Sequence, residues 1–174
     1  MSMRAFTAAA VQLAPVPGPI TSASIKSNVD RCVSIVERCV AESGAELVVL
    51  PETASTGFTP ALSPEQLFEL VDAVPGAVTA PIQEVAARLK VHVVLGTYER
   101  GTPAGTVYNT AALIGPSGDV LGAYRKTHLF AGESASGGGH RHASKRDEQI
   151  AADCDQHERE DEAEQEVAKS AHYL

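Results

Sequence analysis

Two charged residues lie where buried strands are expected to end. Glu52 follows the apolar run 47–50 and a proline, and Lys126 closes the run 120–125. Active sites of α/β proteins collect at the carboxyl ends of strands, so a carboxylate and an ammonium at two such ends could meet across one cleft. A plainer interpretation of each stays open, because a glutamate after Leu-Pro is common as a cap or loop residue and a lysine at a strand end is commonly solvated.

Cysteine and histidine are the other residue types that could do chemistry. Cys32, Cys39 and Cys154 form neither a disulfide framework nor a Cys-x-x-Cys metal pair. Cys32 and Cys39 fall on one predicted helical face and are expected in the core. Four of the six histidines follow residue 130, at spacings that fit no closed zinc pattern, so we expect adventitious metal binding there and no metal site. His128 is expected to pack or hydrogen-bond rather than to act as an acid or base.

The periodicity of the first 130 residues predicts the elements that would position these groups. Strands are predicted over 5–13, 46–50, 91–98, 108–114 and 120–126, and helices over 25–40, 64–73 and 79–89. The runs 46–50 and 91–98 are continuous and apolar, which is typical of strands buried on both faces. Tyr98-Glu99-Arg100 is expected to end its strand with a local ion pair, and a Gly-Pro-Ser-Gly-Asp turn predicts a hairpin between the last two strands. This order indicates a layered α/β fold.

The composition of the chain changes after residue 130. Residues 1–130 contain 9 Lys or Arg and 11 Asp or Glu, whereas residues 131–174 contain 5 and 11. The second segment has three large aliphatic residues, which is too little apolar surface to offset the entropy of ordering it. We therefore predict a folded domain over 4–130 and a mostly disordered acidic tail over 131–174.

The overall charge narrows the classes of partner. The net charge is −8 and the pI is about 5.2, which argues against nucleic acid or an anionic membrane as the main partner, because both attract clustered Lys and Arg. No apolar run approaches the roughly 18 residues that span a bilayer. The N-terminus lacks the apolar core of a signal peptide, so a cytoplasmic protein is expected.

Two stretches resemble signatures of the nitrilase, or carbon–nitrogen hydrolase, superfamily. Residues 46–52 (Glu-Leu-Val-Val-Leu-Pro-Glu), followed by Thr-Gly-Phe at 56–58, resemble the first signature. Residues 122–130 (Gly-Ala-Tyr-Arg-Lys-Thr-His-Leu-Phe) resemble the second. Val11-Gln12 and Tyr108-Asn109-Thr110-Ala111 also fit, so the resemblance covers nearly all of residues 4–130 in the right order. Each motif alone is moderately specific, and their joint occurrence identifies the chain as a member of the family.

The resemblance implies a fold and a chemistry. The fold would be the N-terminal portion of a four-layer α-β-β-α sandwich. The reaction would be hydrolysis of non-peptide C–N bonds in small amides, nitriles or ureido compounds by a Glu-Lys-Cys triad, without a cofactor. Glu52 matches the general base, which a thiol nucleophile needs to lose its proton, and Lys126 matches the cation that stabilises the oxyanion. Glu133 is the candidate for a further carboxylate that orients substrate.

The third signature of the family has no clear counterpart. It should be a strand that ends in Cys, followed by an aromatic residue, an acid and a helix. The chain offers only Cys154, which no predicted strand precedes and which lies between two aspartates that disfavour a thiolate. The nucleophile is therefore not identified, with Cys154 as a weak candidate. A frameshift, a truncated gene or a misjoined gene model would produce such a tail.

Three hypotheses about function remain open. The chain is a carbon–nitrogen hydrolase with Glu52 and Lys126 in triad positions and the nucleophile missing. Alternatively, it is a catalytically inactive fragment or partner subunit that supplies half a sandwich, in which case an exposed apolar sheet face should make it self-associate. In the third hypothesis, Cys154 is recruited through an unusual loop. The resemblance also leaves a homo-oligomer open, and it does not separate amide, nitrile and ureido substrates.

Overall fold

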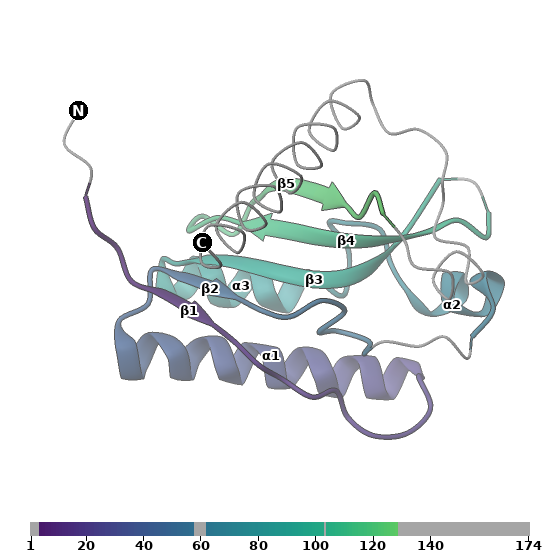
Figure 1. Ribbon diagram of the computed structural model, residues 1–174, viewed down its shortest axis with the longest axis horizontal. Coiled ribbons are helices and arrows are strands. Elements are labelled where there is room, and N and C mark those ends of the chain that lie inside the picture. The colour runs from purple at the N-terminus through teal and green to yellow at the C-terminus, as the bar shows by residue number, and fades with distance from the viewer. Residues whose placement is uncertain (1–3, 58–61, 103, 129–174) are drawn as a thin grey trace, which may run out of the picture. The chain divides into compact units, whose positions relative to one another are not determined.

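The computed structural model describes residues 4–57, 62–102 and 104–128 (Figure 1). In these ranges five strands form one mixed sheet in the order β1-β2-β3-β4-β5, with the bounds β1 (Ala8–Ala10), β2 (Leu47–Val49), β3 (His92–Arg100), β4 (Val107–Ile114) and β5 (Val120–Arg125). The pairs β1–β2 and β2–β3 are parallel, and the pairs β3–β4 and β4–β5 are antiparallel. The helices are α1 (Ser22–Ser43), α2 (Pro64–Leu70) and α3 (Ala80–Leu89). The predicted order of strands and helices is confirmed.

Helix α1 is longer than its periodicity predicted because both of its ends are capped. Thr21 accepts a hydrogen bond from the backbone of Ser24 in a capping box, and Gly44 ends the helix in the left-handed region with its N–H bonded to Val40. The predicted bounds 25–40 covered only the part that has an apolar face. That face carries the buried residues Ile25, Val29, Cys32 and Val36.

Two elements are shorter than predicted. Helix α2 starts after the N-cap Ser63, but the chain becomes extended at Val71 instead of staying helical to residue 73. Strand β1 is limited to three residues because its ladder partner β2 offers only three, Leu47–Val49. The apolar pattern of residues 5–13 therefore predicted a longer strand than the sheet can pair.

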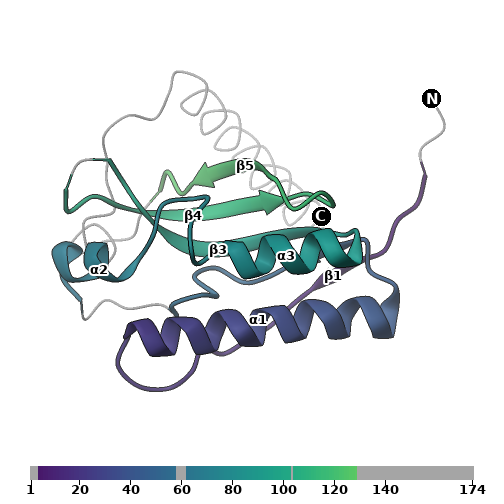
Figure 2. The same ribbon diagram turned by 180° about the vertical axis from the view of Figure 1, so that it is seen from behind.

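Helices α1 and α3 cover one face of the sheet, and the hydrophobic core lies between them and the strands. Figure 2 shows both helices in front of the sheet. The strand residues that meet them are fully buried, since side chains alternate between the two faces of a strand. They include Val48, Val93, Leu95 and Ile114.

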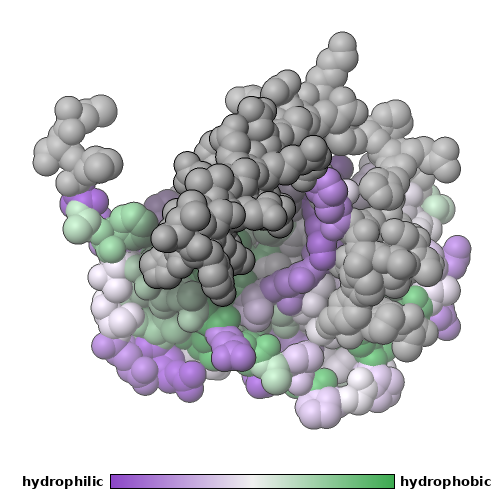
Figure 3. Space-filling model, in the orientation of Figure 1, coloured by the Kyte–Doolittle hydropathy of each residue, from purple (hydrophilic) through white to green (hydrophobic). Residues whose placement is uncertain are grey.

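Among the described residues, several large apolar side chains on the other face of the sheet are exposed. Val49, Leu113 and Tyr124 are exposed and belong to this face by alternation. The expectation that residues 46–50 form a strand buried on both faces is therefore wrong for β2, because Val49 is 36% exposed. Figure 3, seen from this side, shows apolar surface in the left part of the view. We call Val49, Leu113 and Tyr124 the open apolar face.

The predicted acidic tail 131–174 lies outside the described residues, and so do Glu133 and Cys154. No helix in the described ranges is long and apolar enough to cross a membrane.

Candidate active site

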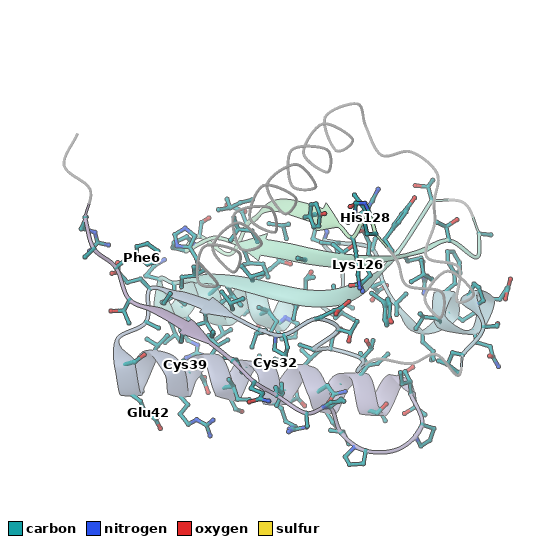
Figure 4. All side chains as sticks on the ribbon, in the orientation of Figure 1. Phe6, Cys32, Cys39, Glu42, Lys126 and His128 are labelled. Atoms are coloured by element: carbon teal, nitrogen blue, oxygen red, sulfur yellow. The ribbon has the colours of Figure 1, made fainter. Side chains whose placement is uncertain are left out.

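The structure brings Glu52 and Lys126 together. The Nζ atom of Lys126 lies 3.0 Å from Oε1 of Glu52, although the residues are 74 positions apart in the chain. Glu52 leaves the end of β2, and Lys126 follows β5 directly. The pair is open to solvent, since the side chains of Glu52 and Lys126 are 55% and 34% exposed. Figure 4 shows Lys126 at the end of the strands that is remote from Phe6.

A buried turn fixes the backbone at Glu52. Thr53 adopts a left-handed conformation (φ 49°), and its carbonyl accepts hydrogen bonds from the N–H groups of Thr56 and Gly57. Residues 53–57 are all buried. The hydroxyls of Ser55 and Thr97 lie 2.7 Å apart and tie the turn to β3. The carboxylate thus projects from a rigid segment into solvent.

Gly96 on β3 makes room for this turn. A Cβ atom there would lie 2.3 Å from the carbonyl oxygen of Pro51 and 2.7 Å from Cα of Glu52. Those distances are far shorter than any normal contact with backbone atoms, so only glycine allows the turn to lie against β3. The close approach places Glu52 beside the strands that carry its partners.

Asn109 on β4 is the second partner of Glu52. Its Nδ2 atom donates a hydrogen bond to Oε1 of Glu52 at 2.5 Å, and its backbone carbonyl accepts from the N–H of Lys126 at 2.8 Å. Asn109 is buried. Sequence reasoning included Asn109 in a family motif but assigned it no role. The available signal was a polar residue among the apolar residues Val107, Ala111 and Leu113 on the same face of the strand.

A second ion pair lies on the opposite side of the same strands. Glu99 of β3 accepts two hydrogen bonds from Arg125, at 3.0 Å and 2.7 Å, and a third from the hydroxyl of Thr110 at 2.7 Å. The guanidinium of Arg125 also lies 4.0 Å from the ring centre of Tyr108. The local ion pair expected at Tyr98-Glu99-Arg100 is therefore wrong. Glu99 pairs across the sheet, because Arg100 points to the other side and stacks on Phe68.

The cysteines in the described ranges are not placed to attack a substrate at Glu52. Cys32 is buried in the core, as predicted, and its burial raises the pKa of the thiol to about 11. Cys39 is half-buried on α1. Figure 4 shows both on α1, away from Lys126. His128 is exposed, with Nδ1 3.1 Å from the hydroxyl of Thr127.

The described residues hold no group of three or more His, Cys, Asp or Glu that could bind a metal ion. The site therefore consists of a carboxylate, an ammonium and a buried carboxamide. Such a group can accept a proton on the carboxylate and stabilise negative charge beside the ammonium.

The family model for carbon–nitrogen hydrolases matches residues 7–153. This chain belongs to the carbon–nitrogen hydrolase family. The match continues beyond residue 130, where the resemblance of the motifs ends, into residues that lie outside the described ranges.

Several carbon–nitrogen hydrolases of known activity are similar to this one. A nitrilase of Pyrococcus abyssi is 38% identical over 105 residues, which is 58% of this chain and 38% of that protein. The omega-amidase of Homo sapiens is 38% identical over 108 residues, 62% of this chain and 37% of the relative. A deaminated glutathione amidase of Synechocystis sp. is 32% identical over 130 residues, 74% of this chain and 44% of the relative. The chain thus spans less than half the length of these relatives.

Solved structures confirm the nitrilase-like α/β fold. An N-terminal amidase superposes with a TM-score of 0.62 at 20% identity, over 75% of this chain and 30% of that one. A carbon–nitrogen hydrolase from Helicobacter pylori gives a TM-score of 0.60 at 20% identity, over 75% of this chain and 42% of that one.

Proposed function

We propose that Glu52 and Lys126 are the general base and the oxyanion-stabilising cation of a hydrolase that cleaves small amides through a cysteine thiol. The observation that carries this proposal is the 3.0 Å contact between Nζ of Lys126, which follows β5, and Oε1 of Glu52, in the turn after β2. Membership in the carbon–nitrogen hydrolase family supports it.

The geometry suits a two-stage reaction. Glu52 takes the proton of the thiol, the sulfur bonds to the amide carbon, and the carbonyl electron pair moves onto oxygen beside the Lys126 ammonium. When the C–N bond breaks, the leaving amine takes the proton back from Glu52. Glu52 then removes a proton from water, and the resulting hydroxide bonds to the thioester carbon. The C–S bond breaks, the acid is released, and the leaving sulfur takes the proton back from Glu52.

The thiol in this scheme is not one of those in the described ranges. Cys32 is buried and its burial disfavours the thiolate. The amidase of Nesterenkonia sp., whose structure is similar (24% identity, TM-score 0.55), carries an acrylamide adduct on its active-site cysteine, which supports a thiol mechanism. Cys154 and a cysteine on another polypeptide segment are the two sources to be tested, and Glu133 stays the proposed substrate-orienting carboxylate.

Amides are the favoured substrates. The omega-amidase and the deaminated glutathione amidase act on amides by name, and the Pyrococcus relative is a nitrilase. Ureido compounds are a third class of substrate to be tested.

The proposed function concerns a folded domain over 4–130. We propose that residues 131–174 form a separate acidic tail.

A second function is favoured by the open apolar face. Val49, Leu113 and Tyr124 expose hydrophobic area on the side of the sheet opposite α1 and α3. The exposed apolar side chains would suit a half-sandwich subunit that pairs with another chain or with itself. In that case the thiol would come from the partner.

Ammonia release tests the first proposal. The full chain is incubated with a terminal carboxamide, a small nitrile and a carbamoyl amino acid. We expect release from the carboxamide, with a loss of about 1,000-fold or more in Glu52→Gln and Lys126→Met. Glu46→Gln and Lys90→Met are matched controls and should keep the activity. Ammonia release that persists in Glu52→Gln would overturn the proposal that Glu52 is the general base.

Acrylamide labelling separates the two sources of the thiol. If Cys154 is the nucleophile, mass spectrometry should find its adduct at neutral pH in the wild type and much less in Glu52→Gln. If Cys154 stays unmodified and no ammonia is released, the chain alone is not the enzyme. Size-exclusion chromatography then tests the half-sandwich, since Leu113→Lys should shift self-associated protein toward monomer, and a wild-type monomer would count against it.

A further inference from the structure

Two hydrogen-bond donors converge on one oxygen of Glu52. Nδ2 of Asn109 and Nζ of Lys126 both bind Oε1, at 2.5 Å and 3.0 Å. None of the hydrogen bonds within the described residues ends on Oε2. The side chain of Glu52 as a whole is 55% exposed. The two oxygens of this carboxylate are therefore unequal.

Asn109 is the more rigid of the two donors. It lies inside β4, hydrogen-bonded between β3 and β5, and it is buried. Lys126 reaches Glu52 through a long side chain at the end of β5, and exposed lysine–carboxylate pairs hold their geometry weakly. The short side chain of Asn109 therefore limits the rotation of the Glu52 carboxylate more than Lys126 does.

The same residue also fixes Lys126. The backbone carbonyl of Asn109 accepts the N–H of Lys126 at 2.8 Å, which continues the β4–β5 ladder one residue past Arg125. One residue thus sets the position of the carboxylate with its side chain and the origin of the lysine side chain with its backbone. A substitution of Asn109 removes the first contact and keeps the second.

We propose that Asn109 is a positioning residue that holds Glu52 by Oε1 and leaves Oε2 as the oxygen that takes the proton. This role rests on the proposed function of Glu52 as the base. Oε1 already accepts a hydrogen bond from an amide and another from an ammonium, so its lone pairs are engaged and the incoming proton goes to the other oxygen. Oε2 accepts no hydrogen bond from a described residue.

Side-chain NMR of the full chain tests the contact without turnover. The Asn109 amide is assigned by its absence in Asn109→Leu. We expect one of its protons to lie downfield of other side-chain amides in the wild type, since its acceptor is a charged oxygen at short distance. Glu52→Ala should abolish this shift, Lys126→Met should keep it, and Glu46→Ala is the control. An unshifted amide in the wild type would overturn the proposal.

The rotamer of Glu52 provides the second readout. Three-bond couplings should indicate one rotamer in the wild type and in Lys126→Met, and averaged rotamers in Asn109→Leu. A merely structural role of Asn109 would change stability and leave the folded protein with one Glu52 rotamer, which would overturn the proposal. Where ammonia release is measurable, Asn109→Leu should lower kcat about 10-fold or more with KM within about twofold.

The two proposals can fail separately. A downfield amide and a single Glu52 rotamer in a protein whose ammonia release survives Glu52→Gln would leave the contact standing and refute the base. A release that requires Glu52, together with a Glu52 rotamer unchanged in Asn109→Leu, would leave the base standing and refute the role of Asn109.

Discussion

Two ion pairs lie at the same end of the sheet and on opposite sides of it. Arg125 and Lys126 are consecutive residues, so their side chains point to opposite faces. Arg125 binds Glu99 through two hydrogen bonds, and the Glu99 side chain is only 6% exposed. Nζ of Lys126 lies 3.0 Å from Oε1 of Glu52, whose side chain is 55% exposed.

The difference indicates that the Glu99–Arg125 pair supports the fold, whereas the Glu52–Lys126 pair is available for chemistry. Both oxygens of Glu99 accept hydrogen bonds, one from Arg125 alone and the other from Arg125 and Thr110. Both hydrogen bonds that described residues donate to Glu52 end on Oε1. The Glu99–Arg125 pair lies on the face of the sheet that α1 and α3 cover. The Glu52–Lys126 pair lies on the side of the open apolar face.

Removal of Arg125 should have the largest effect on stability. Arg125→Met leaves the buried Glu99 carboxylate without its cation, and breaking such a pair costs about 3–5 kcal/mol. Urea unfolding of the full chain measures the change. A cost below about 1 kcal/mol would show that the Glu99–Arg125 pair does not hold the strand ends together.

The buried thiol on α1 predicts a pH dependence. Burial raises the pKa of Cys32 from its ordinary 9.0 to about 11. The unfolded chain therefore loses this proton first as pH rises. The contribution of the neutral thiol is fully present below pH 9 and is lost as pH rises from 9 through 11, by about 3 kcal/mol in total. Urea unfolding from pH 8 to 11 checks this.

The matched variants isolate that contribution from other groups that titrate at high pH. Cys32→Ala should show a smaller fall in stability over the same range than the wild type, whereas Cys39→Ala should fall like the wild type. If the free energy of unfolding falls equally in all three proteins, the pKa of Cys32 is the same in the folded and the unfolded chain, which would contradict this prediction.

A methyl group at position 96 should break one ion pair and spare the other. Gly96→Ala forces the turn at Glu52 away from β3, at a cost of about 1–3 kcal/mol. We expect the downfield amide of Asn109 to disappear while Arg125 keeps its contact with Glu99. Gly122→Ala is the control, since a Cβ there meets nothing within 4 Å. A retained Asn109 signal in Gly96→Ala would contradict this account.

Loss of the exposed cation should have the smallest effect on stability. Lys126→Met removes a solvent-exposed pair and should change the free energy of unfolding by less than about 1 kcal/mol. Urea unfolding beside Arg125→Met gives the comparison directly. If the two variants lose equal stability, the division between a structural pair and an open pair does not hold.

Local sequence signals were enough to predict the helices and strands. Periodicity and turn residues predicted every strand and helix in the described ranges, and the caps at Thr21 and Gly44 explain the longer α1. Two motifs that resemble family signatures contain Glu52 and Lys126 and lie at the ends of strands. Alternation of side chains could not show that β2 is open on one side, because burial depends on which elements reach each face.

The long-range partners required the folded chain. Glu99 was expected to pair with its neighbour, and it pairs with a residue 26 positions away because β3, β4 and β5 align in register. Asn109 stood in a motif without a role, because its partner comes from the turn after β2. The requirement for glycine at position 96 is visible only once that turn lies on β3.

The sequence by itself determined the family, the order of the elements and the residue types at the site, because these depend on local periodicity and on motifs. The tertiary structure decided which oxygen of Glu52 is occupied, which acid Arg125 binds and which face of the sheet is open. Those outcomes depend on strand register and on close approach between segments far apart in the chain, and no local pattern contains that information.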